Sequence, residues 1–216
     1  MKNNLTELIF ILDRSGSMAG LEKDTIGGFN AMIRKQRDGV GKTLVTTMLF
    51  DQEYQFIHDR LPLEEVPELT EETYTVRGCT ALLDAVGTVV DYLGIIHKYA
   101  REEDRPDRTL IVITTDGMEN ASRRFSYERV QELIRRGQEA YGWEILFLGA
   151  NMDAAKEAGR MGIRKEWTAD YHADPRGTAV VYDAVGDTIR EARNNRCAPV
   201  SAGWKRRIDE DYKKRR

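Results

Sequence analysis

Runs of apolar residues recur along the chain and predict buried strands. Residues 8–12, 110–113 and 145–148 are apolar without polar alternation. Strands that are buried on both faces of a parallel sheet show this pattern, whereas half-exposed strands alternate between apolar and polar residues. We therefore expect these three segments to be central strands of a mostly parallel sheet.

Between these runs, apolar residues fall at the three- and four-residue spacing of amphipathic helices. The pattern occurs at residues 26–33, 82–93 and 130–134, and residues 177–195 suit a last amphipathic helix. Alternating strands and helices with right-handed crossovers form a doubly wound open sheet. The sequence therefore predicts an α/β domain of three layers.

Two further apolar segments, residues 44–50 and 54–58, are separated by only three polar residues. So short a connection favours an antiparallel hairpin, which we place at one edge of the sheet. The expected fold is a mostly parallel, six-stranded sheet with one antiparallel edge strand, and the apolar pattern locates five of the six strands.

The C-terminal end differs in composition from the rest of the chain. We expect a domain over residues 1–195 and a charged extension over residues 196–216, which includes the stretch GWKRRIDEDYKKRR from Gly203. Because chain termini are usually loose, the extension is expected to be a solvated, partly frayed helix. A basic docking tail is the alternative.

Charge and cysteine content narrow the function classes. A formal net charge of -3 argues against a chain-wide nucleic-acid footprint, which needs a clustered basic excess. Cys79 and Cys197 are far apart and supply neither a disulfide framework nor a zinc ligand set.

No stretch approaches the roughly 20 apolar residues of a membrane span, and Asp13 interrupts the first apolar run too early for a signal peptide. We expect a cytoplasmic protein that binds neither nucleic acid nor membrane.

Small oxygen-bearing side chains collect where strands end. Ligands of open α/β sheets bind outside the carboxyl ends of the strands, near the point where the strand order reverses. Three segments contribute to this edge: Asp13, Ser15 and Ser17 follow the first strand, Thr80 opens a predicted helix, and Asp116 follows a later strand. Five oxygen side chains are thus expected together.

Carboxylates and hydroxyls without histidine or thiol suit a hard cation. Mg²⁺ prefers octahedral oxygen ligands and keeps several waters, so it is the expected ion, with Mn²⁺ and Ca²⁺ as alternatives. Gly16, Gly20 and Gly117 would let the backbone approach the ion closely. The sequence therefore predicts a metal-binding loop after the first strand.

These motifs carry a resemblance to a known family. The segments D-R-S-G-S at Asp13, G-C-T ending at Thr80 and T-T-D-G containing Asp116 resemble the metal-ion-dependent adhesion site, or MIDAS, of von Willebrand factor type A (vWA) domains. The resemblance covers about residues 5–195 and extends to small stand-alone bacterial type A proteins, some of them linked to stress or tellurium resistance. It implies that Ser15, Ser17 and Thr80 contact the metal directly, and that Asp13 and Asp116 act directly or through water.

A divalent ion held mainly by neutral hydroxyls keeps much of its positive field, so an open coordination position attracts a carboxylate. We expect a Mg²⁺-dependent protein-interaction module, an adaptor or scaffold without catalytic activity, whose partner supplies an Asp or Glu. The resemblance implies partners such as an AAA-type ATPase, a chelatase, a kinase or a phosphatase. Two alternatives stay open: a metal-dependent enzyme acting on phosphoesters, with Glu119 as its nearby acid, and a purely structural ion.

Other polar residues near these motifs have two interpretations. Arg123 and Arg124 either contact an acidic partner or solvate the start of a helix, and Asn151 and Asp153 either line the site or cap a helix. The residues expected to surround the metal are Arg14, Met18, Glu119, Asn120, Arg123 and Arg124.

Overall fold

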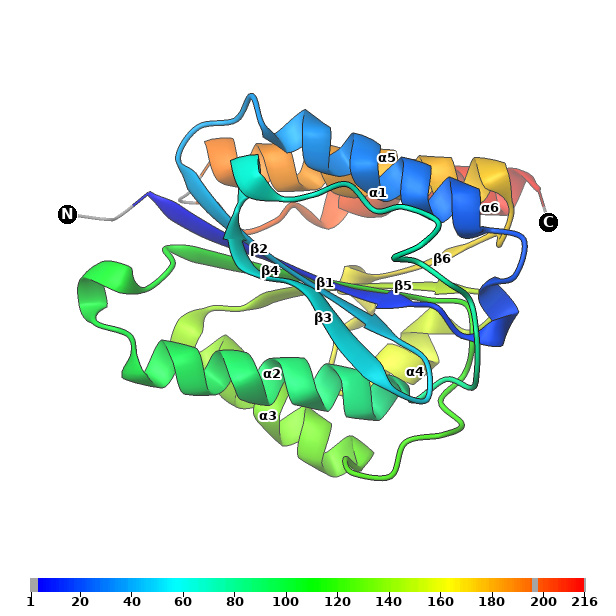
Figure 1. Cartoon of the computed structure of the whole chain (residues 1–216), viewed down its shortest axis with the longest axis horizontal. Helices are drawn as coiled ribbons and strands as arrows, with labels where there is room; N and C mark the ends of the chain where they lie inside the picture. The colour runs from blue at the N-terminus through cyan, green and yellow to red at the C-terminus, as the bar shows by residue number, and fades with distance from the viewer. Residues whose placement is uncertain (1–3, 196–197, 216) are drawn as a thin grey trace.

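A six-stranded sheet lies between two layers of helices in the computed structural model, which describes residues 4–195 and 198–215 (Figure 1). The strand order is β3-β2-β1-β4-β5-β6, and every neighbouring pair is parallel except β2 with β3. The strands are β1 (Leu5–Asp13), β2 (Lys42–Phe50), β3 (Tyr54–Pro62), β4 (Arg108–Thr115), β5 (Glu144–Ala150) and β6 (Thr168–Tyr171). The predicted fold class, including the antiparallel edge strand, is confirmed.

Helices cover both faces of the sheet (Figure 1). One layer contains α1 (Glu22–Gln36), α5 (Pro175–Asn194) and α6 (Arg206–Lys214), and the other contains α2 (Leu82–Tyr99), α3 (Tyr127–Tyr141) and α4 (Ala154–Arg160). Short 3₁₀ helices span Gly16–Met18, Leu63–Glu65, Glu102–Asp104, Lys165–Trp167 and Ala202–Lys205. Within the described residues, no helix has both the length and the apolar character needed to cross a membrane.

The two-sided burial of β1 explains its unbroken apolar run. Leu8, Phe10 and Leu12 belong to the core cluster that includes residues of α1 and α5, whereas Ile9 and Ile11 belong to the cluster that includes residues of α2 and α3. Successive side chains of a strand point to opposite faces, so both faces need apolar residues when helices cover both.

The C-terminal segment is packed and not only solvated. Trp204 and Ile208 are buried, and the Trp204 indole donates a hydrogen bond from Nε1 to the Glu166 carbonyl at 2.9 Å. The expected helix is present as α6, but the expectation that it is solvated and frayed was wrong, because apolar side chains anchor it to the domain. Residues 196–197, where the predicted domain boundary falls, lie outside the described residues.

The topology determines where the predicted site lies. After β1 the chain crosses to the face covered by α1, and after β4 it crosses to the face covered by α3 (Figure 1). The adjacent strands β1 and β4 therefore mark the switch point, at whose carboxyl edge ligands of such sheets bind. Asp13 ends β1, and Asp116 follows β4 directly.

Candidate metal centre

Four of the five predicted oxygen side chains form one hydrogen-bonded chain. Thr80 Oγ1 donates to Ser15 Oγ at 3.0 Å, Ser15 Oγ lies 3.1 Å from Ser17 Oγ, and Ser17 Oγ donates to Asp116 Oδ1 at 2.5 Å. These residues come from three segments that are far apart in sequence. The structure therefore brings them together at the switch point, and their role as metal ligands stays a prediction.

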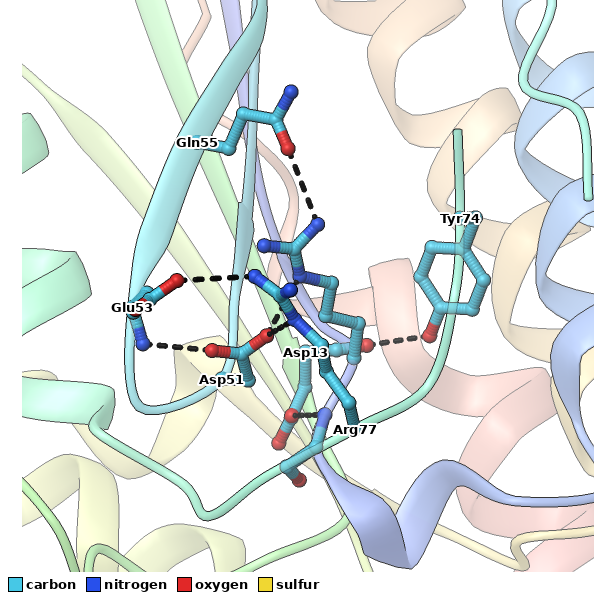
Figure 2. Close-up of polar contacts among 8 residues, drawn as sticks. Asp13, Asp51, Glu53, Gln55, Tyr74 and Arg77 are labelled. Carbon is cyan, nitrogen blue, oxygen red and sulfur yellow. Dashed lines mark hydrogen bonds and ion pairs between the residues drawn. The ribbon is translucent and has the colours of Figure 1, made fainter. Parts of the chain in front are cut away.

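Asp13 lies directly behind this chain of hydroxyls. Its Oδ1 accepts a hydrogen bond from the Ser15 backbone N–H at 2.7 Å, and its Oδ2 accepts one from Thr115 Oγ1 at 2.6 Å. Tyr74 fixes the end of the strand by donating its hydroxyl to the Asp13 carbonyl at 2.5 Å, as Figure 2 shows. The backbone N–H of Ser15 and the hydroxyls of Thr115 and Tyr74 that donate to this residue are electrically neutral.

Burial raises the pKa values of both carboxylates in the cluster. The pKa of Asp13 rises to about 6, because desolvation outweighs the hydrogen bonds from Thr115 and Ser15, and because the charge of Asp116 adds to the effect. The pKa of Asp116 is also raised by burial, against the hydrogen bond from Ser17. In the described part of the chain, neither carboxylate forms an ion pair with a basic side chain.

This arrangement fits a hard divalent cation. A cation at the hydroxyls would supply the positive charge that the two buried carboxylates lack, and the oxygen-only donor set suits Mg²⁺. Gly117 keeps the neighbouring space open, because a Cβ there would lie 2.7 Å from Thr80 Oγ1 and 3.3 Å from Ser17 Oγ. Ser17 is exposed, so the cluster is accessible from solvent. Among residues 4–195 and 198–215, no three His, Cys, Asp or Glu side chains form a metal-binding group.

An ion-pair network holds the first loop in place. Arg14 Nε and Arg77 Nε both donate to Asp51 Oδ2, at 2.9 and 2.8 Å, and the Arg14 guanidinium also reaches Gln55 Oε1 at 3.3 Å. Figure 2 shows Asp51 and Gln55 on the hairpin of β2 and β3 and Arg77 on the segment that leads to Thr80. Arg14 is 3% exposed, so its expected place at the surface around the metal was wrong.

Asp51 remains ionised in this network. Burial alone would raise its pKa, but the hydrogen bonds from Arg77 and the Glu53 N–H, together with the charge of Arg14, hold the pKa below its usual value. The Arg14 carbonyl also accepts a hydrogen bond from the Arg77 N–H at 2.8 Å. The loop with Ser15 and the segment before Thr80 are thus joined through one buried carboxylate and one backbone bond.

The side chains of Glu119 and Asn120 accept hydrogen bonds from their own chain. The Glu119 carboxylate accepts hydrogen bonds from the backbone N–H groups of Leu83, Ala121 and Ser122 at 2.7–2.9 Å, and from Ser122 Oγ at 2.7 Å. Asn120 Oδ1 accepts from the Thr80 N–H at 2.9 Å. These bonds fix the loop after Asp116 to the first turn of α2. Glu119 is therefore a capping residue for α2 in this structure.

Asp84 connects the same two segments from the other side. Its carboxylate accepts hydrogen bonds from the backbone N–H groups of Arg123, Arg124 and Phe125 at 2.8–2.9 Å. The side chain of Arg124 extends to the hairpin, where its Nη1 donates to the Tyr54 hydroxyl at 2.6 Å. The loops with Thr80 and Asp116 are thus held as one unit.

The surface beside the cluster differs in part from the expectation. Met18 was expected there but is buried, whereas Met118, which sequence reasoning missed, is 63% exposed. Its position directly after Asp116 and Gly117 could have indicated it. Asp153 caps α4 by accepting a hydrogen bond from the Lys156 N–H at 2.9 Å, so the capping interpretation is correct for this residue.

Comparisons of sequence and of structure give different results. No protein-family model matches the sequence, and no curated protein matches it. Solved structures do match. Proximal thread matrix protein 1 of the mussel byssus, with a zinc-occupied MIDAS motif, is 15% identical with a TM-score of 0.59, over 87% of this chain and 46% of that chain.

Two further solved structures are similar. The vWF domain of the type V pilus tip protein Mfa5 from Porphyromonas gingivalis is 12% identical, with a TM-score of 0.59 over 91% of this chain and 98% of that chain. The ArnB paralog VWA2 from Sulfolobus acidocaldarius is 14% identical, with a TM-score of 0.55 over 87% and 45%. The chain thus spans less than half of the mussel and Sulfolobus chains. These similarities show that it has the fold of von Willebrand factor type A domains.

Proposed function

We propose that the protein is a metal-dependent protein-interaction module. A divalent ion, Mg²⁺ by the chemistry of the donors, is held by the hydroxyls of Ser15, Ser17 and Thr80, with Asp13 and Asp116 acting directly or through water. The observation that carries this proposal is the meeting of three hydroxyls with two buried carboxylates that have no basic partner among the described residues. The zinc-occupied MIDAS motif of the similar mussel protein supports a divalent ion at this edge of the fold.

The partner contributes a carboxylate. Neutral hydroxyl ligands leave the ion much of its positive field, and the exposed Ser17 marks the side from which an Asp or Glu of a partner would reach it. Met118 offers an exposed apolar contact next to that position. We propose an adaptor or scaffold of the cytoplasm, acting beside a partner such as an AAA-type ATPase, a kinase or a phosphatase.

We further propose that the site binds and does not catalyse. A metal-dependent hydrolase needs a base close to the water that the ion activates. Glu119, the acid considered for that role, already accepts four hydrogen bonds from the α2 turn and its own loop. Its use as a helix cap supports binding over phosphoester chemistry.

Affinity capture from lysate of the source cell tests the proposal. Wild type, Asp116→Ala and the control Asp38→Ala, an exposed aspartate in the turn after α1, are compared in Mg²⁺ and in EDTA. We expect a partner that is retained only in Mg²⁺, by wild type and the control but not by Asp116→Ala. Retention that is equal in EDTA would contradict a metal-dependent interface. A melting temperature that falls in EDTA, with partner retention unchanged, would indicate a purely structural ion.

A further inference from the structure

An apolar groove lies between α2 and α3, on the face of the sheet opposite α1 and α5 (Figure 1). Its volume is about 550 Å³, and Val90, Leu133 and Trp143 are among the residues that line it. Two large apolar side chains on the α2 side stand in solvent, with Ile95 54% and Tyr99 74% exposed. A small molecule inside the groove would leave this outer ridge uncovered, so the surface suits a larger occupant.

Gly94 lies in the same face of α2, and its own chain does not require it. A glycine inside a helix costs roughly 0.5–1 kcal/mol relative to alanine. At Gly87 and Gly137 the reason is internal, because a Cβ would lie 2.4 Å from Phe125 and 1.9 Å from Trp143. At Gly94 the nearest atom, on the Trp143 ring, would be 4.0 Å away, which is ordinary contact. The lack of a side chain at Gly94 leaves room for a second backbone to approach this face closely.

Two side chains of opposite charge flank Gly94 on this face of α2. Asp91 and Lys98 are seven residues apart, so they lie on the same side of the helix, one before and one after the glycine. Neither forms an ion pair with a described residue of its own chain; Lys98 Nζ lies 5.1 Å from the centre of the Tyr99 ring. A second, antiparallel α2 would place a lysine opposite each aspartate.

The charged α3 residues that line the groove, Arg136 and Glu139, form ion pairs within their own helix. Arg136 pairs with Glu132, and Arg135 Nη1 lies 2.7 Å from Glu139 Oε2, all within the same helix. Among the described residues that line the groove, Asp91 and Lys98 are the charged side chains without an ion pair in their own chain.

We infer that this face binds a second copy of the chain. The two α2 helices cross antiparallel at Gly94, around a twofold axis, so that Asp91 faces Lys98 of the partner subunit and Lys98 faces Asp91 of the partner subunit. Such an interface is isologous, because the same patch serves both subunits. Ile95 and Tyr99 of each subunit enter the apolar groove of the other, which removes the exposed ridge from water.

The antiparallel pairing also determines where the two candidate metal sites of the dimer lie, and this point rests on the proposed function. The amino end of α2 adjoins Thr80, so the antiparallel pair places the two candidate metal sites at opposite ends of the dimer. The first residues of the two helices would be roughly 40 Å apart along the axis, at 1.5 Å per residue. Such a dimer connects two partners that approach from opposite directions.

Charge reversal with analytical ultracentrifugation of the full chain tests the dimer, from about 1 µM to about 1 mM, a range that detects weak and standard interfaces. Asp91→Lys and Lys98→Asp are each expected to weaken self-association by about tenfold or more, because each places like charges opposite each other twice. An equimolar mixture of the two variants should form a heterodimer about as stable as the wild-type homodimer. Asp38→Ala serves as a surface control without effect.

The double variant Asp91→Lys/Lys98→Asp should regain self-association, and Tyr99→Ser should lose it. Circular dichroism confirms that each variant folds, which is expected because the substituted side chains are on the surface. A wild-type chain that stays monomeric over the whole range would overturn the inference, and the groove would then serve another occupant or none. Dimers that both single reversals leave unchanged would overturn it as well, because the contact would lie elsewhere. Loss of metal binding through Asp116→Ala should leave the dimer intact.

Discussion

Strand β1 carries a buried carboxylate near each of its ends, and the two are compensated in opposite ways. Glu7 has no exposed surface and Asp13 is 1% exposed. Glu7 pairs with Arg60, and its Oε2 lies 2.6 Å from His97 Nε2. The carboxylate of Asp13 receives hydrogen bonds from the neutral Ser15 N–H and Thr115 hydroxyl, and it forms no ion pair with a described residue. The charge is balanced inside the chain at one end of the strand and unbalanced at the other.

The hydrogen-bond network around Glu7 extends beyond Arg60 and His97 to Trp143. Trp143 Nε1 donates to His97 Nδ1 at 3.0 Å, and an indole N–H can only donate, so Nδ1 must accept. The proton of the neutral imidazole is therefore on Nε2, where it is donated to Glu7. The comparison teaches that burial alone does not distinguish the two carboxylates; the presence or absence of a countercharge does.

The largest effect on stability is expected at the Glu7 end of β1, where the buried charge is balanced. Glu7→Gln leaves Arg60 without its buried anion, and breaking such a pair costs about 3–5 kcal/mol of unfolding free energy. Urea denaturation measures this loss. Mg²⁺ affinity, measured by calorimetry, should be unchanged in the folded variant, and a lost affinity would contradict the separation of the two ends.

At the Asp13 end of β1, removal of the charge is expected to increase stability. Asp13→Asn removes a buried charge that has no basic partner among the described residues, so the metal-free protein at pH 7 should gain about 3 kcal/mol in unfolding free energy. The same change should abolish Mg²⁺ binding. Denaturation in EDTA checks the gain; a loss of stability as large as that of Glu7→Gln would show that Asp13 is balanced after all.

The difference in stability between wild type and Asp13→Asn should depend on pH. The folded protein holds the Asp13 proton up to about pH 6, whereas the unfolded chain releases it near 3.8. The resulting stabilisation of wild type is complete below pH 3.8 and is lost as the pH rises through about 6, by about 3 kcal/mol. Melting curves in EDTA between pH 4 and 7 should show the two proteins diverging in that window, and saturating Mg²⁺ should reverse the divergence. Parallel curves across the window would refute the raised pKa.

The smallest effect is expected from a single methyl group. Gly117→Ala places a Cβ against Thr80 Oγ1 and Ser17 Oγ, so the hydroxyls must shift. We expect Mg²⁺ affinity to fall by about tenfold with little change in stability in EDTA. Gly142→Asn, which replaces a left-handed glycine after α3, is the matched control and should leave the affinity unchanged. Calorimetry with both variants checks this.

Much of the fold could be predicted because its signals are local. Unbroken apolar runs indicated β1, β4 and β5, since helices cover both faces of the sheet. β6 has four residues and α4 has seven, which is too short for a clear period. In the charged C-terminal segment, Trp204 and Ile208 do recur four residues apart, but the surrounding charges obscured the pattern.

In the candidate site, too, local motifs could be recognised in the sequence, whereas long-range contacts could not. Its five oxygen residues are in short motifs at strand ends, so topology rules bring them together. The contacts that hold these residues in place cannot be recognised from such motifs. Asp51 pairs with Arg14, which is 37 residues away in the sequence, and Tyr74 donates to the Asp13 carbonyl, 61 residues away. Glu119 looked like a free acid because its helix-capping partners depend on how the loop folds against α2.

The most direct test of the central claim is a titration of Mn²⁺ followed by water-proton relaxation, with Mg²⁺ as competitor, on wild type and Asp13→Asn. The unbalanced charge at the end of β1 predicts one saturable site in wild type, displaced by Mg²⁺ and absent in Asp13→Asn. Glu7→Gln, if folded, should bind like wild type. No saturable site in wild type, or an equal site in Asp13→Asn, would contradict the account.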